Sequence, residues 1–493
     1  MQISRRRFLA VSSGLAANCL VKAETSTQPP VVYGPTPSKR QLVWHSLETY
    51  AFLHFSVNTF TDKEWGYGDE DPNIFNPTAF DPDAIVHSLK AGGMKALILT
   101  CKHHDGFCLW PTKTTEHCIR NSRWRDGKGD VVGDIAAAAK RARLKFGVYV
   151  SPWDRANPKY ATPDYLPIYH QQVTELLTNY GPIFEVWFDG ANGGDGYYGG
   201  ARERRSINHD YYEWDKTIAI IRRLQPNAVV FGSVGDIRWV GNEDGIAGDP
   251  HWETYSVPAG GLQNEHASAG GSKRELMTGV RNGSMWKPAE CDVSIRPGWF
   301  WHEKENSRVK TADQLIDLYF ESVGRGASFL LNVPPNRQGL IEKGDTASIA
   351  EFHQKLEEIF SNDLALSAKF QPSNVRAGDD RFSPTNLVDG DRTTYWSTDD
   401  SVTSPHLIIH LDSERQIQIV RLREAIKLGQ RIGAFALDSW QNNEWHEVAT
   451  GTSIGSCRLI RLSRPCETRR LRLRITDSPV CIALSELGLF GQI

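Results

Sequence analysis

Hydrophobic and polar positions along the chain follow one pattern before about residue 365 and another after it. In the first region, short continuous apolar runs alternate with segments whose apolar residues recur every three to four positions. The runs predict buried strands and the recurring segments predict amphipathic helices. The predicted strands are residues 50–55, 95–100, 146–150, 183–188, 228–232 and 328–333, and the predicted helices are residues 81–92, 131–144, 164–180, 210–224, 311–324 and 342–360.

Alternating strands and helices predict a parallel sheet. Polar side chains follow several of the strands, and the alternation lasts for most of the region, so residues 41–365 are expected to form a (β/α)8-like barrel in the α/β class. The alternative is an open, doubly wound sheet. That fold is disfavoured because the first strand is not followed by a glycine-rich dinucleotide-binding turn.

The region after residue 365 reads as an all-β domain. Its segments alternate apolar with polar residues, as in residues 406–411 and 470–475. Such alternation is typical of half-buried antiparallel strands. We therefore predict a β-sandwich over residues 366–493.

The amino terminus has the three parts of an export signal: a run of arginines from Arg5 to Arg7, a short apolar segment, and the segment Val21-Lys22-Ala23 before an expected cut after Ala23. We predict a twin-arginine-like signal peptide over residues 1–23 and a Pro/Thr-rich linker over residues 24–40. The protein is then expected to be exported, to the periplasm or the extracellular space. Lipid anchoring at Cys19 is the weaker alternative, because the preceding residues fit a lipoprotein signal poorly.

Charge and hydropathy do not imply nucleic acid or a membrane as a partner. The 493-residue chain has a net charge of −3 and 23% charged residues, which favours neither nucleic acid nor an anionic membrane. The rest of the chain contains no apolar run long enough to span a bilayer. Fifteen Trp residues suit the stacking of sugar rings, although Trp is also a common core residue.

The candidate chemistry centres on Asp189, which follows the apolar run 183–188. The carboxyl ends of strands in a parallel barrel present catalytic side chains. Trp187 lies two residues earlier and therefore points to the same side. A carboxylate beside an indole is typical of a site that binds a sugar ring. The alternative is that Asp189 only caps a helix.

Other polar residues follow neighbouring strands. His54 ends the first strand, His103 and His104 follow the second, and Asp105 comes next. These residues suggest a metal-dependent hydrolase, but adjacent strand residues face opposite sides, and no histidine pair has the i, i+2 spacing of a metal site. We therefore expect hydrogen bonding to sugar hydroxyls, with no metal and no cofactor for catalysis.

Hydrolysis of a glycosidic bond requires a second carboxyl group. Glu243 is the first candidate, because it lies in a polar loop near Trp239. Asp244, Glu253 and Glu290 compete for this role.

Four motifs together resemble glycoside hydrolase family 29, the α-L-fucosidases: His54-Phe55-Ser56, Lys102-His103-His104-Asp105-Gly106-Phe107, Gly147-Val148-Tyr149-Val150-Ser151 and Val186-Trp187-Phe188-Asp189-Gly190. The resemblance covers roughly residues 40–360. It implies a barrel-like catalytic domain that releases terminal α-L-fucose with retention and without a metal. Asp189 then resembles the nucleophile, and the residues that resemble fucose-binding positions are His54, Trp65, His103, His104, Tyr149 and Trp187. Glu64, beside Trp65, joins the candidate substrate-binding residues.

The sequence Gly241-Asn242-Glu243 resembles the acid/base loop of the family branch selective for α-1,3/1,4-linked fucose. This implies Glu243 as the acid/base and branched glycans as substrates. Trp299 and His302 are candidates for an outer subsite, or else structural residues of a loop.

The C-terminal region resembles a discoidin (factor V/VIII C-type) domain, on residues 386–396 and 484–490. Trp396 is predicted to be a core residue. The resemblance implies a structural calcium ion as an option, with Asp389 and Asp391 as its ligands.

The first hypothesis is therefore an exported, retaining α-L-fucosidase that acts on fucosylated oligosaccharides or glycoconjugates. The alternative is a non-catalytic protein that binds fucosylated glycans on a glycosidase scaffold.

Overall fold

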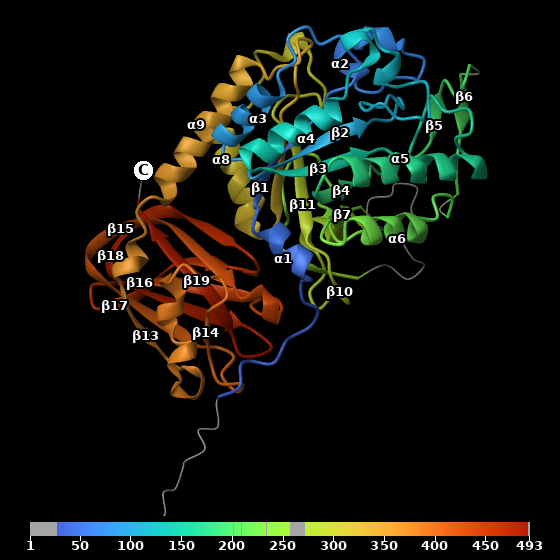
Figure 1. The fold of residues 1–493 in the computed structure, drawn as a ribbon. Helices are drawn as coiled ribbons and strands as arrows, with labels where there is room; N and C mark the ends of the chain where they lie inside the picture. Colours follow the sequence, from blue (N-terminus) through green and yellow to red (C-terminus); the bar gives the residue numbers. More distant parts are fainter. Residues whose placement is uncertain (1–26, 201, 209, 233, 257–271, 492–493) are drawn as a thin grey trace, which may run out of the picture.

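The computed structural model describes residues 27–200, 202–208, 210–232, 234–256 and 272–491. The predicted signal peptide, residues 1–23, lies outside the described residues. The chain forms two bodies joined by a long helix, with the all-β body in orange and red beside the mixed α/β body (Figure 1).

The first body is a parallel barrel. Its eight strands are β1 (Thr49–Leu53), β2 (Ala96–Lys102), β3 (Lys145–Val150), β4 (Ile183–Trp187), β7 (Val229–Phe231), β8 (Arg238–Trp239), β11 (Ala289–Ser294) and β12 (Ser328–Asn332). They pair in the order β7-β4-β3-β2-β1-β12-β11-β8, and every pair is parallel. A parallel bridge between Phe231 and Ile237 brings the two end strands together. The nearly closed ring therefore follows the chain order, which confirms the predicted (β/α)8-like barrel.

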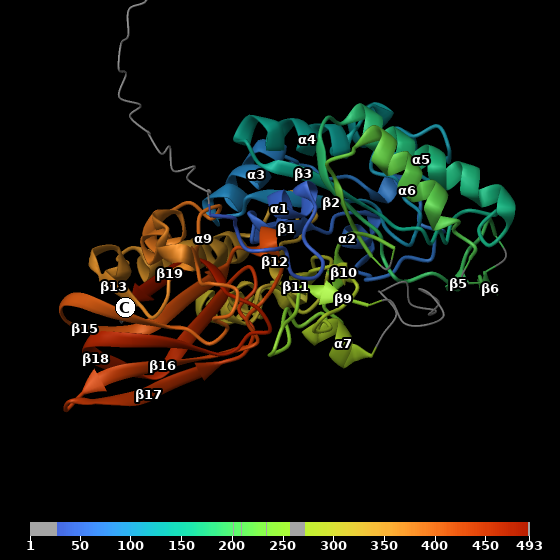
Figure 2. The same ribbon diagram turned by 90° about the horizontal axis from the view of Figure 1, so that it is seen from below.

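Helices cover the outside of the barrel. They are α3 (Pro82–Ala91), α4 (Val131–Ala142), α5 (Leu166–Asn179), α6 (Trp214–Leu224), α8 (Ala312–Glu321) and α9 (Lys343–Phe360). The start of α3 is fixed locally, since Asp81 accepts a hydrogen bond from the backbone of Ala84 at 3.0 Å and Pro82 occupies the first turn. The view from below shows α3, α4, α5 and α6 along one side of the barrel (Figure 2).

Two barrel strands were missed by the sequence pattern. The segment from Arg238 was expected to be a loop, but Arg238 and Trp239 form β8, which is only two residues long. Strand β11 carries two acidic residues, Glu290 and Asp292, so it does not read as an apolar run. Both acidic side chains are buried.

The second body is an antiparallel sheet structure that confirms the predicted β-sandwich. Its strands are β13 (Lys369–Pro372), β14 (Trp396–Ser397), β15 (His406–Glu424), β16 (Ala434–Gln441), β17 (Glu444–Gly451), β18 (Arg458–Asp477) and β19 (Ala483–Phe490). The long strands β15 and β18 are bulged, which lets each bend along its length. Trp396 is fully buried in this core, as predicted.

Shorter elements complete the fold: α1 (Lys39–His45), α2 (Val57–Thr61), α7 (Lys273–Thr278), β5 (Gly194–Gly196), β6 (Glu203–Arg205), β9 (Thr254–Tyr255) and β10 (Met285–Trp286). Within the part of the chain that the structure describes, no helix has the length and apolar character needed to cross a bilayer.

Ion pairs join the two bodies. Glu48, just before β1, lies 2.9 Å from the guanidinium of Arg423 and 3.0 Å from that of Arg392. Burial opposes the charge of Glu48, but the two arginines and Lys95 outweigh it and lower its pKa to about 2. The all-β body is thus attached to the amino end of β1, away from the carboxyl ends of the barrel strands.

Candidate active site

Asp189 lies two residues beyond the end of β4, at the carboxyl edge of the barrel. Its Oδ2 accepts a hydrogen bond from the phenol of Tyr149 at 3.0 Å, and its Oδ1 accepts one from the backbone N–H of Ala191 at 2.8 Å. Nε2 of His104 lies 3.8 Å from Oδ2. The carboxylate is therefore held from both sides while its side chain stays partly exposed, as a nucleophile requires.

Three histidines line the same cavity as this carboxylate, and burial keeps their rings neutral. Nδ1 of His54 lies 3.0 Å from Oδ1 of Asn332, and Nδ1 of His104 lies 2.7 Å from Oγ of Ser151. Burial lowers the pKa of His54 to about 3, that of His104 to about 4, and that of His103 well below its usual range. Neutral imidazoles can donate and accept hydrogen bonds, which suits the recognition of sugar hydroxyls.

His103 and His104 lie side by side rather than on opposite faces. Their ring centroids are 4.1 Å apart, and both rings line the same cavity. The expectation of opposite faces was wrong because β2 ends at Lys102. The alternation of side chains applies within a strand and does not extend into the loop after it.

The candidate residues meet in one cavity of about 330 Å³. It is lined by Phe52, His54, Glu64, Trp65, His103, His104, Trp187, Asp189, Glu243, Asp292, Pro297, Gly298 and Trp299. A second cavity of about 220 Å³ shares Trp65, Trp187, Asp189, Glu243 and Asp292 with the first. The two predicted catalytic carboxyl groups thus open into the same space, with Tyr149 hydrogen-bonded to one of them.

Glu243 lies at the mouth of this cavity, and its Oε2 accepts a hydrogen bond from the indole N–H of Trp299 at 3.1 Å. Although part of the side chain is exposed, the surrounding atoms partly desolvate the carboxyl group. This desolvation, with the charges of Asp189, Glu64 and Asp244, raises its pKa, and the Trp299 N–H opposes the shift. A raised pKa suits a group that must donate a proton.

His302 does not line the cavity, but it forms a hydrogen bond with Glu64, which does. Its Nε2 lies 2.6 Å from Oε1 of Glu64, and its Nδ1 lies 2.6 Å from Oδ1 of Asp62. Glu64 also accepts the backbone N–H of Trp299 at 2.9 Å. Burial lowers the pKa of His302, but its two carboxylate partners outweigh burial and raise it overall. Of the two outer-subsite candidates, Trp299 lines the cavity and His302 holds Glu64.

Two competitors for the second carboxyl group are buried elsewhere. Glu253 is fully buried and accepts a hydrogen bond from the backbone of Ser456 in the all-β body. Glu290 is fully buried inside the barrel. Asp244 is exposed next to Glu243 but is not among the lining residues of either cavity.

Sequence reasoning missed Asp292, Asn332 and Phe52. Asp292 lines both cavities and accepts the indole N–H of Trp239 at 2.8 Å. Burial raises its pKa well above the usual range, with Glu243 and Glu290 adding to the shift. Its position two residues after Glu290 was the available signal, and it could be used only once residues 289–294 were recognised as a strand.

The geometry of the site gives no support to the hypothesis of a metal-dependent hydrolase. Among the residues that the structure describes, no group of three or more His, Cys, Asp and Glu side chains is arranged to hold a metal ion. In the all-β body, Asp389 accepts the backbone N–H of Asp391 at 2.8 Å, and Asp391 accepts that of Thr393 at 2.8 Å. Calcium at Asp389 and Asp391 stays a prediction of the sequence.

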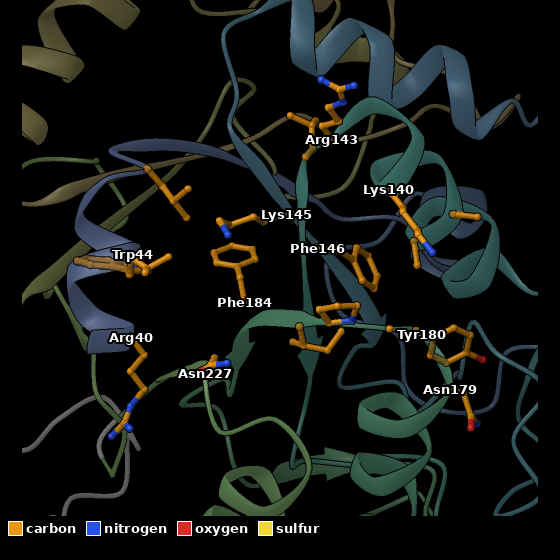
Figure 3. Close-up of a pocket in the computed structure, with 18 of the residues that line it drawn as sticks. Arg40, Trp44, Lys140, Arg143, Lys145, Phe146, Asn179, Tyr180, Phe184 and Asn227 are labelled. Carbon is orange, nitrogen blue, oxygen red and sulfur yellow. The ribbon is translucent and has the colours of Figure 1, made fainter. Parts of the chain in front are cut away.

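A larger cavity of about 880 Å³ lies at the opposite edge of the barrel, near the amino ends of β3 and β4 (Figure 3). Its lining includes Arg40, Lys140, Arg143 and Lys145, and Asp130 is the acidic residue among the described lining residues. Without a pair of carboxyl groups it lacks the groups that glycoside hydrolysis needs.

Comparisons with known proteins agree with the geometry. Residues 35–358 match the profile of the family described as alpha-L-fucosidase, and residues 370–487 match the F5/8 type C domain. "Alpha-L-fucosidase 1" of Arabidopsis thaliana is 41% identical over 462 residues, which cover 92% of this chain and 87% of that protein.

Two solved structures have the same two-body fold. A putative alpha-L-fucosidase from Bacteroides thetaiotaomicron is 37% identical, with a TM-score of 0.86 and coverage of 94% of this chain and 99% of that one. A glycoside hydrolase family 29 fucosidase from Ruminococcus gnavus, in complex with fucose, is 32% identical, with a TM-score of 0.85 and coverage of 94% and 97%.

Proposed function

The chain belongs to glycoside hydrolase family 29 and is an α-L-fucosidase, and we propose that it releases α-1,3/1,4-linked fucose from glycans by a retaining double displacement. Asp189 is the nucleophile and Glu243 is the acid/base in this proposal. The observation that carries it is the shared cavity, in which one carboxylate is held by fixed donors and the other has a raised pKa.

In the first step, the protonated carboxyl group of Glu243 gives its proton to the glycosidic oxygen. An oxygen of Asp189 attacks the anomeric carbon, and the bond to the leaving sugar breaks. In the second step, Glu243, now a carboxylate, takes a proton from a water molecule. The water oxygen attacks the same carbon, fucose is released and Asp189 returns to its carboxylate form.

The surrounding side chains bind and orient the sugar. Neutral His54, His103 and His104 hydrogen-bond to ring hydroxyls, and the indoles of Trp65 and Trp187 contact the apolar face of the ring. Glu64, fixed by His302, accepts a hydrogen bond from a further hydroxyl. These contacts place the anomeric carbon next to Asp189.

The linkage preference rests on the loop that carries Glu243. Asn242 closes this loop, because its Nδ2 donates to the carbonyl of Ile246 at 2.8 Å while its Oδ1 accepts the backbone N–H of Asp244 at 3.1 Å. The loop places Glu243 beside Trp299, where a second sugar of a branched glycan fits. Hydrolysis of linear and branched α-1,2-, α-1,3-, α-1,4- and α-1,6-fucosylated oligosaccharides tests this preference. Faster release from α-1,2 or α-1,6 linkages would contradict it.

The mechanism is tested by NMR observation of the first product and by one substitution. α-L-Fucose appearing before its β anomer is expected for retention, and the β anomer first would overturn the double displacement. Asp189→Asn is expected to leave fucose binding largely intact while turnover falls by about 10⁴-fold or more. Near-normal turnover of this variant would remove Asp189 from the reaction.

Two further parts of the proposal concern regions outside the barrel. We propose export through a signal in residues 1–23, tested by amino-terminal sequencing of the mature protein and by cell fractionation. For calcium at Asp389 and Asp391, the test is the melting temperature with added calcium and with a chelator. Calcium should stabilise the wild type and not the D389N/D391N variant.

A further inference from the structure

Several acidic side chains lie in the barrel interior below Asp189. Glu185 lies two residues before Trp187 on β4, so these two side chains point to the same side of the strand, and Asp189 follows beyond its carboxyl end. Glu290 and Asp292 are placed in the same way on β11, which lies across the ring from β4. Glu185 and Glu290 are fully buried. Side chains that fill a barrel interior in layers meet in this manner.

Within the described residues, Glu290 accepts hydrogen bonds from two aromatic side chains and shares another with the neighbouring carboxyl group of Glu185. Oε1 of Glu290 accepts the indole N–H of Trp187 at 2.7 Å, and its Oε2 accepts the phenol of Tyr50. Within the described residues, no ion pair links Glu290 or Glu185 to a cation. Glu185 accepts the indole N–H of Trp44 at 3.2 Å with Oε2, while its Oε1 is buried without a partner.

Burial of two neighbouring carboxyl groups disfavours the state in which both glutamates are charged. Burial raises the pKa of Glu185 well above its usual range, and the neighbouring Glu290 adds to this shift. Burial also raises the pKa of Glu290, to about 7. A facing pair of buried carboxyl groups retains a proton for this reason. The retained proton lowers the free-energy cost of burying Glu290 beneath the active site. It also leaves an oxygen of Glu290 free to accept the hydrogen bond from Trp187.

Trp187 depends on this oxygen for its orientation. Its ring stacks on Phe231 with centroids 4.1 Å apart and planes 6° apart, and on Tyr149 at 5.2 Å and 25°. Stacking restrains the plane of the ring but leaves it free to slide and to rotate in that plane. The hydrogen bond to Glu290 fixes this remaining freedom. Trp187 forms part of the wall of both cavities next to Asp189.

We propose that Glu290 is a positioning residue of the fucosidase site: it anchors the indole of Trp187 from inside the barrel and thereby sets the contact of this ring with the sugar. The inference rests on the assignment of this cavity as the fucose site. It does not depend on which carboxyl group attacks, nor on the linkage that is cleaved.

The test is a double-mutant cycle of Glu290→Met and Trp187→Phe, with Glu290→Gln as the conservative variant. Glu185→Gln is the matched control, because it replaces the carboxyl neighbour of Glu290 with a neutral isostere and Glu185 itself does not bond to Trp187. KM and kcat are measured on a chromogenic α-L-fucoside, and the dissociation constant is measured for L-fucose. The melting temperature of each variant reports folding.

Glu290→Met should raise both KM and the dissociation constant about tenfold, because the buried indole N–H loses its acceptor, with a smaller change in kcat. Glu290→Gln keeps a carbonyl oxygen and should stay within about twofold of the wild type, as should Glu185→Gln. On the Trp187→Phe background, which has no N–H to anchor, Glu290→Met should change KM by less than about twofold.

A tenfold or larger effect of Glu290→Met on the Trp187→Phe background would overturn the proposal, as would failure of the double variant to fold. A folded Glu290→Met variant with the KM and dissociation constant of the wild type would overturn it as well. If Asp189 is not the nucleophile, the Asp189→Asn enzyme stays active while the double-mutant cycle of Glu290 and Trp187 gives the same result. The two proposals can therefore fail independently.

Discussion

The phenol of Tyr149 donates a hydrogen bond to Oδ2 of Asp189 at 3.0 Å, and Nε2 of His104 lies 3.8 Å from the same oxygen. The other oxygen of Asp189 accepts a backbone N–H. One edge of the carboxylate is therefore fixed by β3 and by the loop after β2. This arrangement orients the carboxylate before a substrate arrives, so loss of the Tyr149 hydrogen bond should lower activity measurably.

Tyr149→Phe should lower kcat/KM by about 10- to 100-fold, because a hydrogen bond to a charged group contributes about 1.5–3 kcal/mol. The measurement is steady-state hydrolysis of a chromogenic α-L-fucoside. Tyr169→Phe is the control, because its phenol bonds to the carbonyl of Val150 in the fold and not to the site. A Tyr149→Phe enzyme within about twofold of the wild type would contradict the role of this hydrogen bond.

Glu243→Gln should affect substrates according to their leaving groups. A nitrophenyl leaving group departs without much protonation, whereas a sugar hydroxyl requires an acid. We therefore expect a larger loss of kcat/KM on a fucosylated oligosaccharide than on a nitrophenyl fucoside, by about 10-fold or more. Equal losses on both substrates would mean that Glu243 does not donate the proton.

Trp299→Phe should move the alkaline limb of the pH profile to higher pH. The indole N–H of Trp299 stabilises the ionised form of Glu243 and so lowers its pKa. Without this donor the pKa rises, and Glu243 keeps its proton to higher pH. The profile of kcat/KM against pH measures this shift. A limb displaced to lower pH would show that another group controls it.

Glu48→Ala should destabilise the junction of the two bodies. Arg423 would keep Glu486 as a carboxylate partner, so the expected loss in the free energy of unfolding is smaller than the roughly 3–5 kcal/mol of an uncompensated buried charge. The folded-state pKa of Glu48 is lowered to about 2, so its stabilising effect is complete above the unfolded value of 4.5 and is lost as the pH falls toward 2. Denaturant unfolding at pH 7 and at pH 3 should therefore show a smaller difference between variant and wild type at the lower pH. A difference that grows on acidification would contradict the ion pair.

Much of the barrel could be predicted because its strands are either buried on both faces or followed by polar residues at one edge. Residues 183–188 read as a strand and Asp189 as its polar end, since both features are local in the sequence. Strand β11 escaped detection because its acidic residues point into the interior, where other side chains of the barrel satisfy them. A polar strand of this kind can be recognised only from its neighbours.

The sequence by itself determined the two-body organisation, the barrel class and the residues that gather around Asp189, because periodicity and short motifs are properties of adjacent positions. Tertiary structure alone decided that His103 and His104 share a cavity, that His302 holds Glu64, and that Glu290 reaches Trp187 from across the barrel. Each of these depends on side chains from elements far apart in the chain, and only closure of the ring brings their atoms within hydrogen-bonding distance.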